Sequence, residues 1–384
     1  MKLGILTFHR TVNDGSVLQN WCLQRILRSI SPGADVETID LRIARREVQE
    51  YRRLLSRRPP FVQLSTVQKM LLLRQFINRE IALSSRSKTT DSLAAASKFI
   101  SQQGYGAVVS GSDTVWQMAK VGTMEPPHLY FMPGFTGYKK IAFAVSADPV
   151  ADTAVLDNAE RREALLQAVS DFEFIGVRDE TTRRLLEQLG LPAERIHFMP
   201  DPTILEDFSS LVRMPSTRLT GGKVAGLALQ SASLAAAVSE VLQSQGWTVV
   251  NHLGPTPAGA QSLTSGESLG DRLGRFATQD LLISDRFHSS IFTLKLGSAP
   301  VIFVESAKKW PEPTSKGRDL LGRLGCSDFV WRSGSKPKTE LQPLLEAVDA
   351  WRRNPPDMTA RFKHLRDSAK PALDRLATIL RQPG

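Results

Sequence analysis

The chain has 384 residues, with 49 lysines and arginines against 39 aspartates and glutamates, which gives a formal net charge of +10. This length exceeds the size at which one hydrophobic core usually stops growing, so we expect two domains. A hydrophobic fraction of 41% excludes a largely disordered chain, and only two cysteines exclude a disulfide framework. The positive charge favours an anionic partner. The classes of partner that fit are a nucleic acid, a membrane surface, and a phosphorylated or carboxylated substrate.

The first part of the chain predicts a doubly wound α/β domain. A short apolar run is typical of a buried strand, and apolar residues at helical spacing follow from about Ser16. Strands are expected at 3–8, 36–41, 106–110, 140–145, 174–177 and 195–199, and a helix at 182–189 that Gly190 ends. No apolar stretch reaches the ~20 residues that span a bilayer. The first run is also too short for a signal peptide, so we expect a cytoplasmic protein.

Arginine is concentrated in residues 42–58, which hold seven of them before Pro59 and Pro60. The simpler interpretation is a solvated helix face. The alternative is contact with anionic lipid head groups or a charged glycan carrier, which would bring the protein to the inner face of the membrane.

A second α/β unit is expected after the stretch of low hydrophobicity near 207–221, which is the predicted linker. The predicted domains are therefore 1–215 and 216–384. Strands are expected at 223–229, 247–251, 281–284 and 300–304, and helices at 232–244 and 289–296. Two further amphipathic helices are separated by Pro355 and Pro356. The sequence thus predicts two Rossmann-like domains that face a cleft.

The clearest local signal for function is the segment SDRFHSS, residues 284–290, between a predicted strand and a predicted helix. Loops at the carboxyl ends of parallel strands face the ligand crevice. Arg286 and His288 are two residues apart, so in an extended loop they point the same way. The helix start behind them presents free amides that suit a phosphate or carboxylate. The segment predicts an anion site with a proton donor; the alternative is a capped helix with an incidental histidine.

Other strand ends supply further polar groups. They are Asn13 and Gly15, Ser112 and Asp113, and Arg178. Each also has a structural interpretation, as a helix-capping turn, a plain turn or a surface arginine. Asp201-Pro202-Thr203 is expected to be a structural turn. The chain has no helix–turn–helix, zinc-finger or RNA-binding signature, no metal-ligand spacing, no P-loop and no G-x-G-x-x-G motif. Nucleic acid, metal, dinucleotide and ATP are therefore not expected.

In chain order, these segments resemble the polysaccharide pyruvyltransferase family along nearly the whole sequence. The matching residues are Gly4–His9 with Asn13, Gly15 and Val17–Gln19; Val109–Asp113 with Val115 and Trp116; Gly176–Glu180 with Leu185, Leu186, Leu189 and Gly190; Asp201–Thr203; and Ser284–Ser289. Two residues depart from the family's pattern. Asp14 stands where an aromatic residue is common, and Ser16 replaces a usual alanine, which affects the expected acceptor site.

The resemblance implies two Rossmann-like domains of the GT-B type, with phosphoenolpyruvate as donor substrate and no cofactor or metal. The product would be a pyruvate ketal across two hydroxyls of a sugar, in a glycan or a lipid-linked oligosaccharide. Active members carry an Arg-x-His element, which Arg286 and His288 match. For catalysis we therefore expect Arg286 and His288, with His288 as general acid. The expected donor ligands are Arg286, Arg178 and the amides of Ser289 and Ser290, and the expected acceptor ligands are Asn13, Gly15, Ser112 and Asp113.

Two other functions remain open. One is a nucleotide-sugar glycosyltransferase of the same architecture, in which Glu305, after the strand at 300–304, would bind ribose hydroxyls. The other is a glycan- or lipid-binding relative without catalytic activity. Retention of both Arg286 and His288 argues against the second, because a binding protein has little need for a proton donor.

Overall fold

The computed structural model describes residues 1–55, 60–148, 157–215, 222–262, 266–312, 314–334 and 336–382. The chain divides into two compact units, Met1–Glu206 with Arg366–Gly384, and Asp207–Leu365. The sequence placed the boundary after residue 215 and the whole C-terminus in the second domain. The structure instead returns the last helix to the first unit, because Leu376 and Leu380 are buried in the core of that unit. Residues 216–221 of the predicted linker lie outside the described residues.

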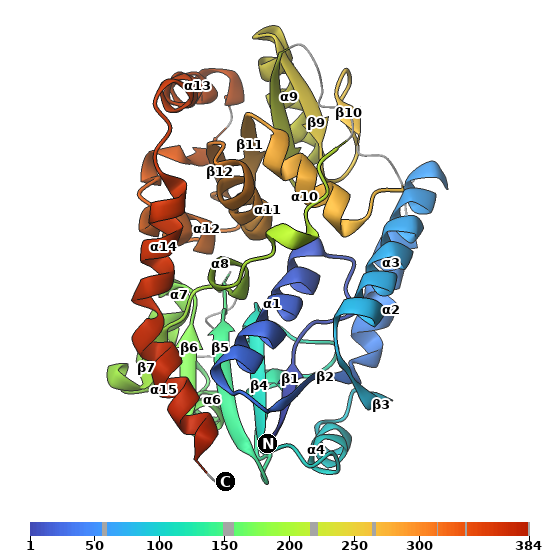
Figure 1. The fold of residues 1–384 in the computed structure, drawn as a ribbon, viewed down its shortest axis with the longest axis vertical. Helices are drawn as coiled ribbons and strands as arrows, with labels where there is room; N and C mark the ends of the chain where they lie inside the picture. Colours follow the sequence, from blue (N-terminus) through green and yellow to red (C-terminus); the bar gives the residue numbers. More distant parts are fainter. Residues whose placement is uncertain are drawn as a thin grey trace. The chain divides into compact units, whose positions relative to one another are not determined.

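The first unit contains a seven-stranded parallel sheet in the order β3-β2-β1-β4-β5-β6-β7 (Figure 1). Its strands are β1 (Lys2–Leu6), β2 (Asp35–Arg42), β3 (Leu83–Thr89), β4 (Ala107–Asp113), β5 (Lys139–Val145), β6 (Phe174–Val177) and β7 (Ile196–Phe198). The chain builds outward from β1 to β3, then returns and builds from β4 to β7. Strand order therefore reverses between β1 and β4, and ligands bind at the carboxyl ends of strands at such a reversal.

Helices cover both faces of this sheet. Its helices include α1 (Asp14–Ile30), α2 (Ala44–Leu55), α3 (Pro60–Glu80), α4 (Leu93–Ser101), α6 (Ala159–Ser170), α7 (Glu180–Leu189), α8 (Pro202–Leu205) and α15 (Lys370–Arg381). Leu23 and Leu27 of α1 pack with Leu376 of α15 on one face, where Figure 1 shows α15 in red beside β6. Residues of α4, α6 and α7 belong to the cluster on the other face. Alternate residues of a strand face opposite sides of the sheet. Where helices cover both sides, the sequence of a central strand is therefore typically a nearly continuous apolar run.

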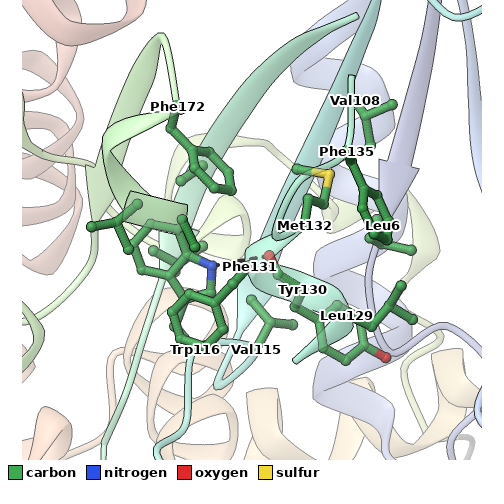
Figure 2. Packing of buried hydrophobic residues seen from close by; sticks show 14 of the residues in the cluster. Leu6, Val108, Val115, Trp116, Leu129, Tyr130, Phe131, Met132, Phe135 and Phe172 are labelled. Carbon is green, nitrogen blue, oxygen red and sulfur yellow. Dashed lines mark hydrogen bonds between the residues drawn. The ribbon is translucent and has the colours of Figure 1, made fainter. Parts of the chain in front are cut away.

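The long connection between β4 and β5 contributes Trp116, Tyr130 and Phe131 to an aromatic cluster (Figure 2). The indole of Trp116 stacks on Phe131, with ring centroids 5.2 Å apart, and meets the edge of Phe172 at 5.2 Å. Its Nε1 donates to the carbonyl of Tyr130 at 3.2 Å, and the Ser110 hydroxyl donates to the same carbonyl at 2.7 Å. This packing fixes the chain directly after Asp113, the last residue of β4.

The second unit contains a six-stranded parallel sheet in the order β10-β9-β8-β11-β12-β13. Its strands are β8 (Lys223–Ala228), β9 (Trp247–Asn251), β10 (Gln261–Ser262), β11 (Leu281–Ser284), β12 (Val301–Ser306) and β13 (Val330–Ser333). Its helices include α9 (Ala232–Ser244), α10 (Leu269–Thr278), α11 (Phe287–Phe292), α12 (Lys316–Arg323) and α13 (Pro337–Arg353), and α14 (Met358–Ser368) passes into the first unit. Strand order reverses between β8 and β11. The predicted α/β class with two Rossmann-like units is confirmed.

Three elements differ from the sequence prediction. The expected loop at 111–113 is the end of β4, with Gly111 at φ 131° and Asp113 at φ 94°. A side chain at Gly111 would clash with the carbonyl of Phe143, since its Cβ would lie 2.1 Å from that oxygen. The helix expected at 289–296 begins earlier, as α11, and the C-terminal region forms three helices rather than two. In the described part of the chain, no helix has the length and apolar character needed to cross a bilayer.

Candidate functional site

The strand-order reversal of the second sheet is held together by Asp285. This residue follows β11, and its amide donates to the carbonyl of Ala228 at the end of β8, at 3.2 Å. Its carboxylate accepts from the amide of Gln230 at 3.0 Å. Asp285 therefore joins the carboxyl ends of the two strands between which a ligand is expected.

Arg286 and His288 follow directly at this position, as the sequence predicted for a strand–helix junction. Arg286 is the N-cap residue of α11, in extended conformation, and its amide donates to the hydroxyl of Ser284 at 2.9 Å. His288 lies in the first turn, with its ring 5.4 Å from that of Phe287 and 6.2 Å from that of Phe292. Both Arg286 and His288 are half-buried. The short segment thus holds a guanidinium and an imidazole at one strand end.

Two lysines flank this segment: Lys309, from the connection between β12 and α12, and Lys316, the first residue of α12. The Lys316 ammonium lies 5.8 Å from the centre of the Phe287 ring. Burial raises the pKa of Asp285, and the Gln230 amide and the charges of Arg286 and Lys309 offset only part of that rise. Lys309 therefore acts on the same carboxylate as Arg286. Sequence analysis missed both lysines, although their position after a predicted strand was a usable signal.

Glu305 fixes this connection rather than facing solvent. Its carboxylate is fully buried, and it accepts from the Ser315 amide at 3.1 Å and from Nη2 of Arg318 at 2.8 Å. Burial alone would raise the pKa of Glu305, but the hydrogen bonds from Arg318 and Ser315 outweigh it and lower the pKa. The expectation that Glu305 binds ribose hydroxyls is not supported, because these contacts already engage both of its oxygens.

In the first unit, Asp113 lies at the strand-order reversal between β1 and β4. Its Oδ2 accepts from the Ser16 hydroxyl in α1 at 2.7 Å, and its Oδ1 accepts from the Thr114 amide at 2.7 Å. Its side chain is 13% exposed. Asp113 thus joins the end of β4 to the first turn of the helix after β1, and its carboxylate borders the expected crevice.

Arg178 lies on the same edge, at the end of β6, but it is buried among carboxylates. Its Nη1 donates to Asp201 at 2.7 Å, and its Nη2 lies 3.6 Å from Asp113. Burial opposes ionisation, but the charges of Asp201, Asp113 and Asp179 outweigh it and raise the pKa of Arg178. The predicted contact with a donor anion is not supported, because the guanidinium is 1% exposed and its charge is already balanced.

Three other predicted ligands have structural contacts instead. Ser112 is fully buried, and its hydroxyl donates to Gln19 at 3.2 Å. The Gly15 amide donates to the side chain of Asn13 at 3.0 Å, which is the capping turn given as the alternative. The Ser290 amide and hydroxyl both donate to the Arg286 carbonyl, at 3.2 and 2.9 Å. These groups are not presented to a ligand. Asn13 is exposed and Ser289 half-buried, and their contacts stay predictions.

Comparison with known proteins gives a family match and a shared fold. The family described as polysaccharide pyruvyl transferase matches residues 13–252, a range that ends before Arg286 and His288. No curated protein matches the chain.

Solved structures of similar fold include two UDP-GlcNAc 2-epimerases. The enzyme from Methanocaldococcus jannaschii, in complex with UDP-GlcNAc and UDP, is 11% identical with a TM-score of 0.55 over 99% of each chain. The enzyme from Neisseria meningitidis, bound to UDP-GlcNAc, is 8% identical with a TM-score of 0.54, over 98% of this chain and 100% of the other. The glycotransferase of kitacinnamycin is 13% identical with a TM-score of 0.51, over 99% and 98%. At these identities the likeness shows the fold alone, which is of the GT-B type.

Proposed function

The chain belongs to the polysaccharide pyruvyl transferase family, and we propose that it transfers the pyruvyl group of phosphoenolpyruvate to two hydroxyls of a sugar. The product is a pyruvate ketal on a glycan or a lipid-linked oligosaccharide precursor. The observation that carries the proposal is the half-buried pair Arg286 and His288 at the strand-order reversal of the second sheet. A cytoplasmic location, at the inner face of the membrane for a lipid-linked acceptor, is part of the proposal.

The donor needs cations at two points, because it carries a carboxylate and a phosphate. Arg286 supplies a planar fork that matches either group, and Lys309 and Lys316 supply two further positive charges beside it. These three residues replace Arg178, whose charge is compensated by Asp201 and Asp113. The backbone amide of Ser289 remains a predicted hydrogen-bond donor to phosphoenolpyruvate. No metal or cofactor is part of the proposal.

The reaction begins with a proton transfer from His288 to the methylene carbon of phosphoenolpyruvate, which becomes the methyl group of the product. The cationic centre at the adjacent carbon then bonds to the oxygen of one sugar hydroxyl, whose proton leaves. The carbon–oxygen bond to phosphate breaks, and the second sugar oxygen bonds to the same carbon with loss of its proton. The products are the ketal and inorganic phosphate. Asp113 and Asn13 orient the acceptor hydroxyls.

A nucleotide-sugar glycosyltransferase is the second function to test, because it shares the GT-B fold. The engaged carboxylate of Glu305 weighs against it. A glycan-binding protein without catalysis is the third, and it leaves the proton donor without a role.

Thermal unfolding with phosphoenolpyruvate, inorganic phosphate or UDP-glucose separates these functions. A ligand at 100 times its Kd stabilises a protein by about 2.7 kcal/mol, which is a clear shift in Tm. We expect the shift with phosphoenolpyruvate, its loss in Arg286→Gln, and its retention in Arg353→Gln, since Arg353 is an exposed arginine of the same unit. Phosphate release on addition of candidate acceptors then tests turnover. Protection by UDP-glucose alone would overturn the proposal.

A further inference from the structure

A second group of charges lies on the carboxyl edge of the first sheet, and the proposed reaction does not use it. At its centre is Asp40 of β2. Arg10 donates to this carboxylate through Nε at 3.0 Å and Nη2 at 2.7 Å, and His9 lies beside it with Nε2 at 3.0 Å. The Nε of Arg42 is 3.5 Å from the same carboxylate. We call His9, Arg10, Asp40, Arg42 and Arg46 the Asp40 cluster.

Arg46 belongs to the first turn of α2 and faces the ring of Phe8. Its guanidinium carbon lies 3.2 Å from the ring centroid, so the aromatic face fixes the guanidinium. The Nη1 of Arg46 is buried, and among the described residues it has no hydrogen-bond partner. The Nε of Arg42 also has no hydrogen-bond partner among the described residues, although it lies 3.5 Å from the Asp40 carboxylate. Buried donors are nearly always satisfied, so the Nη1 of Arg46, together with the long contact of the Arg42 Nε, indicates a missing acceptor near the end of β2.

Charge supports an anionic acceptor at this position. The carboxylate of Asp40 lies against Arg10 and Arg42, and that of Glu47 lies 3.5 Å from Arg42. Burial would raise the pKa of Asp40, but the hydrogen bonds from His9 and Arg10 outweigh it and hold the pKa well below its usual range. Asp40 therefore stays ionised and orients the cations around it. Arg10 and Arg42 are 25% and 31% exposed, so a ligand can reach them.

The position within the sheet connects this cluster to the acceptor. It lies at the ends of β1 and β2, and Asp113 lies at the end of β4, on the other side of β1. A ligand held by an anionic group at the cluster can therefore extend along the same edge toward Asp113. This arrangement also gives a role to part of the arginine-rich segment. Arg45 and Arg52 are exposed, as expected for a solvated face, whereas Arg42 and Arg46 are half-buried. Arg57 and Arg58 lie outside the described residues.

We propose that the Asp40 cluster binds a phosphate or diphosphate group of the acceptor substrate, with Arg42 and Arg46 as its main ligands. Guanidinium groups bind phosphate oxygens in pairs, and each such bond is stronger than one between neutral groups. The assignment to the acceptor depends on the proposed function, whereas the binding of a diphosphate at this position does not.

The test measures binding of inorganic pyrophosphate by calorimetry in the Arg286→Gln background, which silences the proposed donor site. We expect Arg46→Gln and Arg42→Gln each to weaken binding about tenfold or more. Arg45→Gln is the matched control, because Arg45 is exposed and adjacent on the same helix. Arg46→Lys keeps the charge and loses the fork, so it should bind more weakly than the parent. Circular dichroism and Tm show that each variant is folded.

Two further binding measurements identify the source of the phosphate. One uses uridine diphosphate, and the other uses phosphatidylcholine vesicles that contain an isoprenyl diphosphate. The ligand that binds more tightly shows whether the phosphate belongs to a nucleotide or to a lipid carrier. Equal pyrophosphate affinity in all variants, or no binding by the parent, would overturn the site. If pyrophosphate binds as expected but phosphoenolpyruvate does not protect the wild-type protein, the proposed function fails and the diphosphate site stands.

Discussion

Nη1 of Arg178 lies 2.7 Å from the carboxylate of Asp201, and both side chains are almost completely buried. Asp201 also accepts from the amide and hydroxyl of Thr203, at 3.0 and 2.7 Å, as the N-cap of α8. One carboxylate therefore neutralises the arginine at the end of β6 and begins the next helix. The ion pair therefore joins the segment around Arg178 to the segment around Asp201, both of which match the family's pattern.

Asp201→Ala should unfold the first unit more easily, because it leaves the Arg178 charge buried without its closest partner. Removing one member of a buried ion pair costs about 3–5 kcal/mol. Urea unfolding measures this loss. The control is Glu187→Ala, which removes an exposed pair with Arg183 and should cost less than about 1 kcal/mol. Equal effects of the two substitutions would contradict the structural role of Asp201.

His288→Ala should reduce turnover by roughly 10²–10⁴, which is the usual contribution of a positioned general acid. Stability should change little, because the ring is half-buried, and its contacts include Phe287, met edge-on at 5.4 Å, and Phe292, stacked at 6.2 Å. Phosphate release at saturating phosphoenolpyruvate measures turnover, and His364→Ala, at an exposed histidine, is the control. Wild-type turnover in His288→Ala would remove His288 from this role.

Asp285→Asn should change how stability depends on pH. Burial raises the pKa of Asp285 in the folded protein, so the folded state binds the proton more tightly than the unfolded state does. Stability from this group is complete below the ordinary pKa, about 3.9, and is lost as pH rises through the raised value. The asparagine variant should lack this loss and keep the contact with Gln230. Urea unfolding at several pH values in this window measures the difference, and parallel curves for both proteins would refute it.

Glu305→Gln should destabilise the second unit and weaken protection by phosphoenolpyruvate. The carboxylate holds Ser315 and Arg318 at the start of α12, next to Lys316. Because the pKa of Glu305 is lowered, its stabilisation is present above the ordinary pKa of about 4.3 and is lost as pH falls through the folded value. The loss at neutral pH should be about 1–3 kcal/mol, toward the lower end because Arg318 is 35% exposed. A loss of UDP-glucose protection in place of these effects would favour the ribose contact.

The sequence was sufficient to predict the elements whose apolar pattern is regular. The helix at 232–244 matches α9, and Asp179 and Gly190 cap α7 as their types suggest. The position of Arg286 and His288 at a strand–helix junction also followed from local pattern, because the strand at 281–284 is a continuous apolar run.

Which polar groups face a ligand could not be predicted in the same way. Ser112 and Asp113 are adjacent and both polar, yet the Ser112 hydroxyl is buried against Gln19, whereas the Asp113 side chain is 13% exposed. The difference depends on the backbone of β4, which reaches φ 94° at Asp113. The sequence predicted Arg178 as a surface residue or a ligand. Its ion-pair partner Asp201 is 23 residues away along the chain, so the pair could not be predicted from local pattern. Lys309 was missed because it lies 24 residues after Asp285, and only the fold brings its charge near that carboxylate.

The return of α15 to the first sheet has a consequence for how the protein is made. The second unit, Asp207–Leu365, is an insertion within the first, which is completed only by Arg366–Gly384. During synthesis the ribosome releases the strands of this sheet long before it releases α15, whose Leu376 and Leu380 are buried in one cluster with Phe174 of β6. Until then the part of that face of the sheet beside β6 lacks its covering helix, and the second unit begins to fold beside a neighbour that is still unfinished.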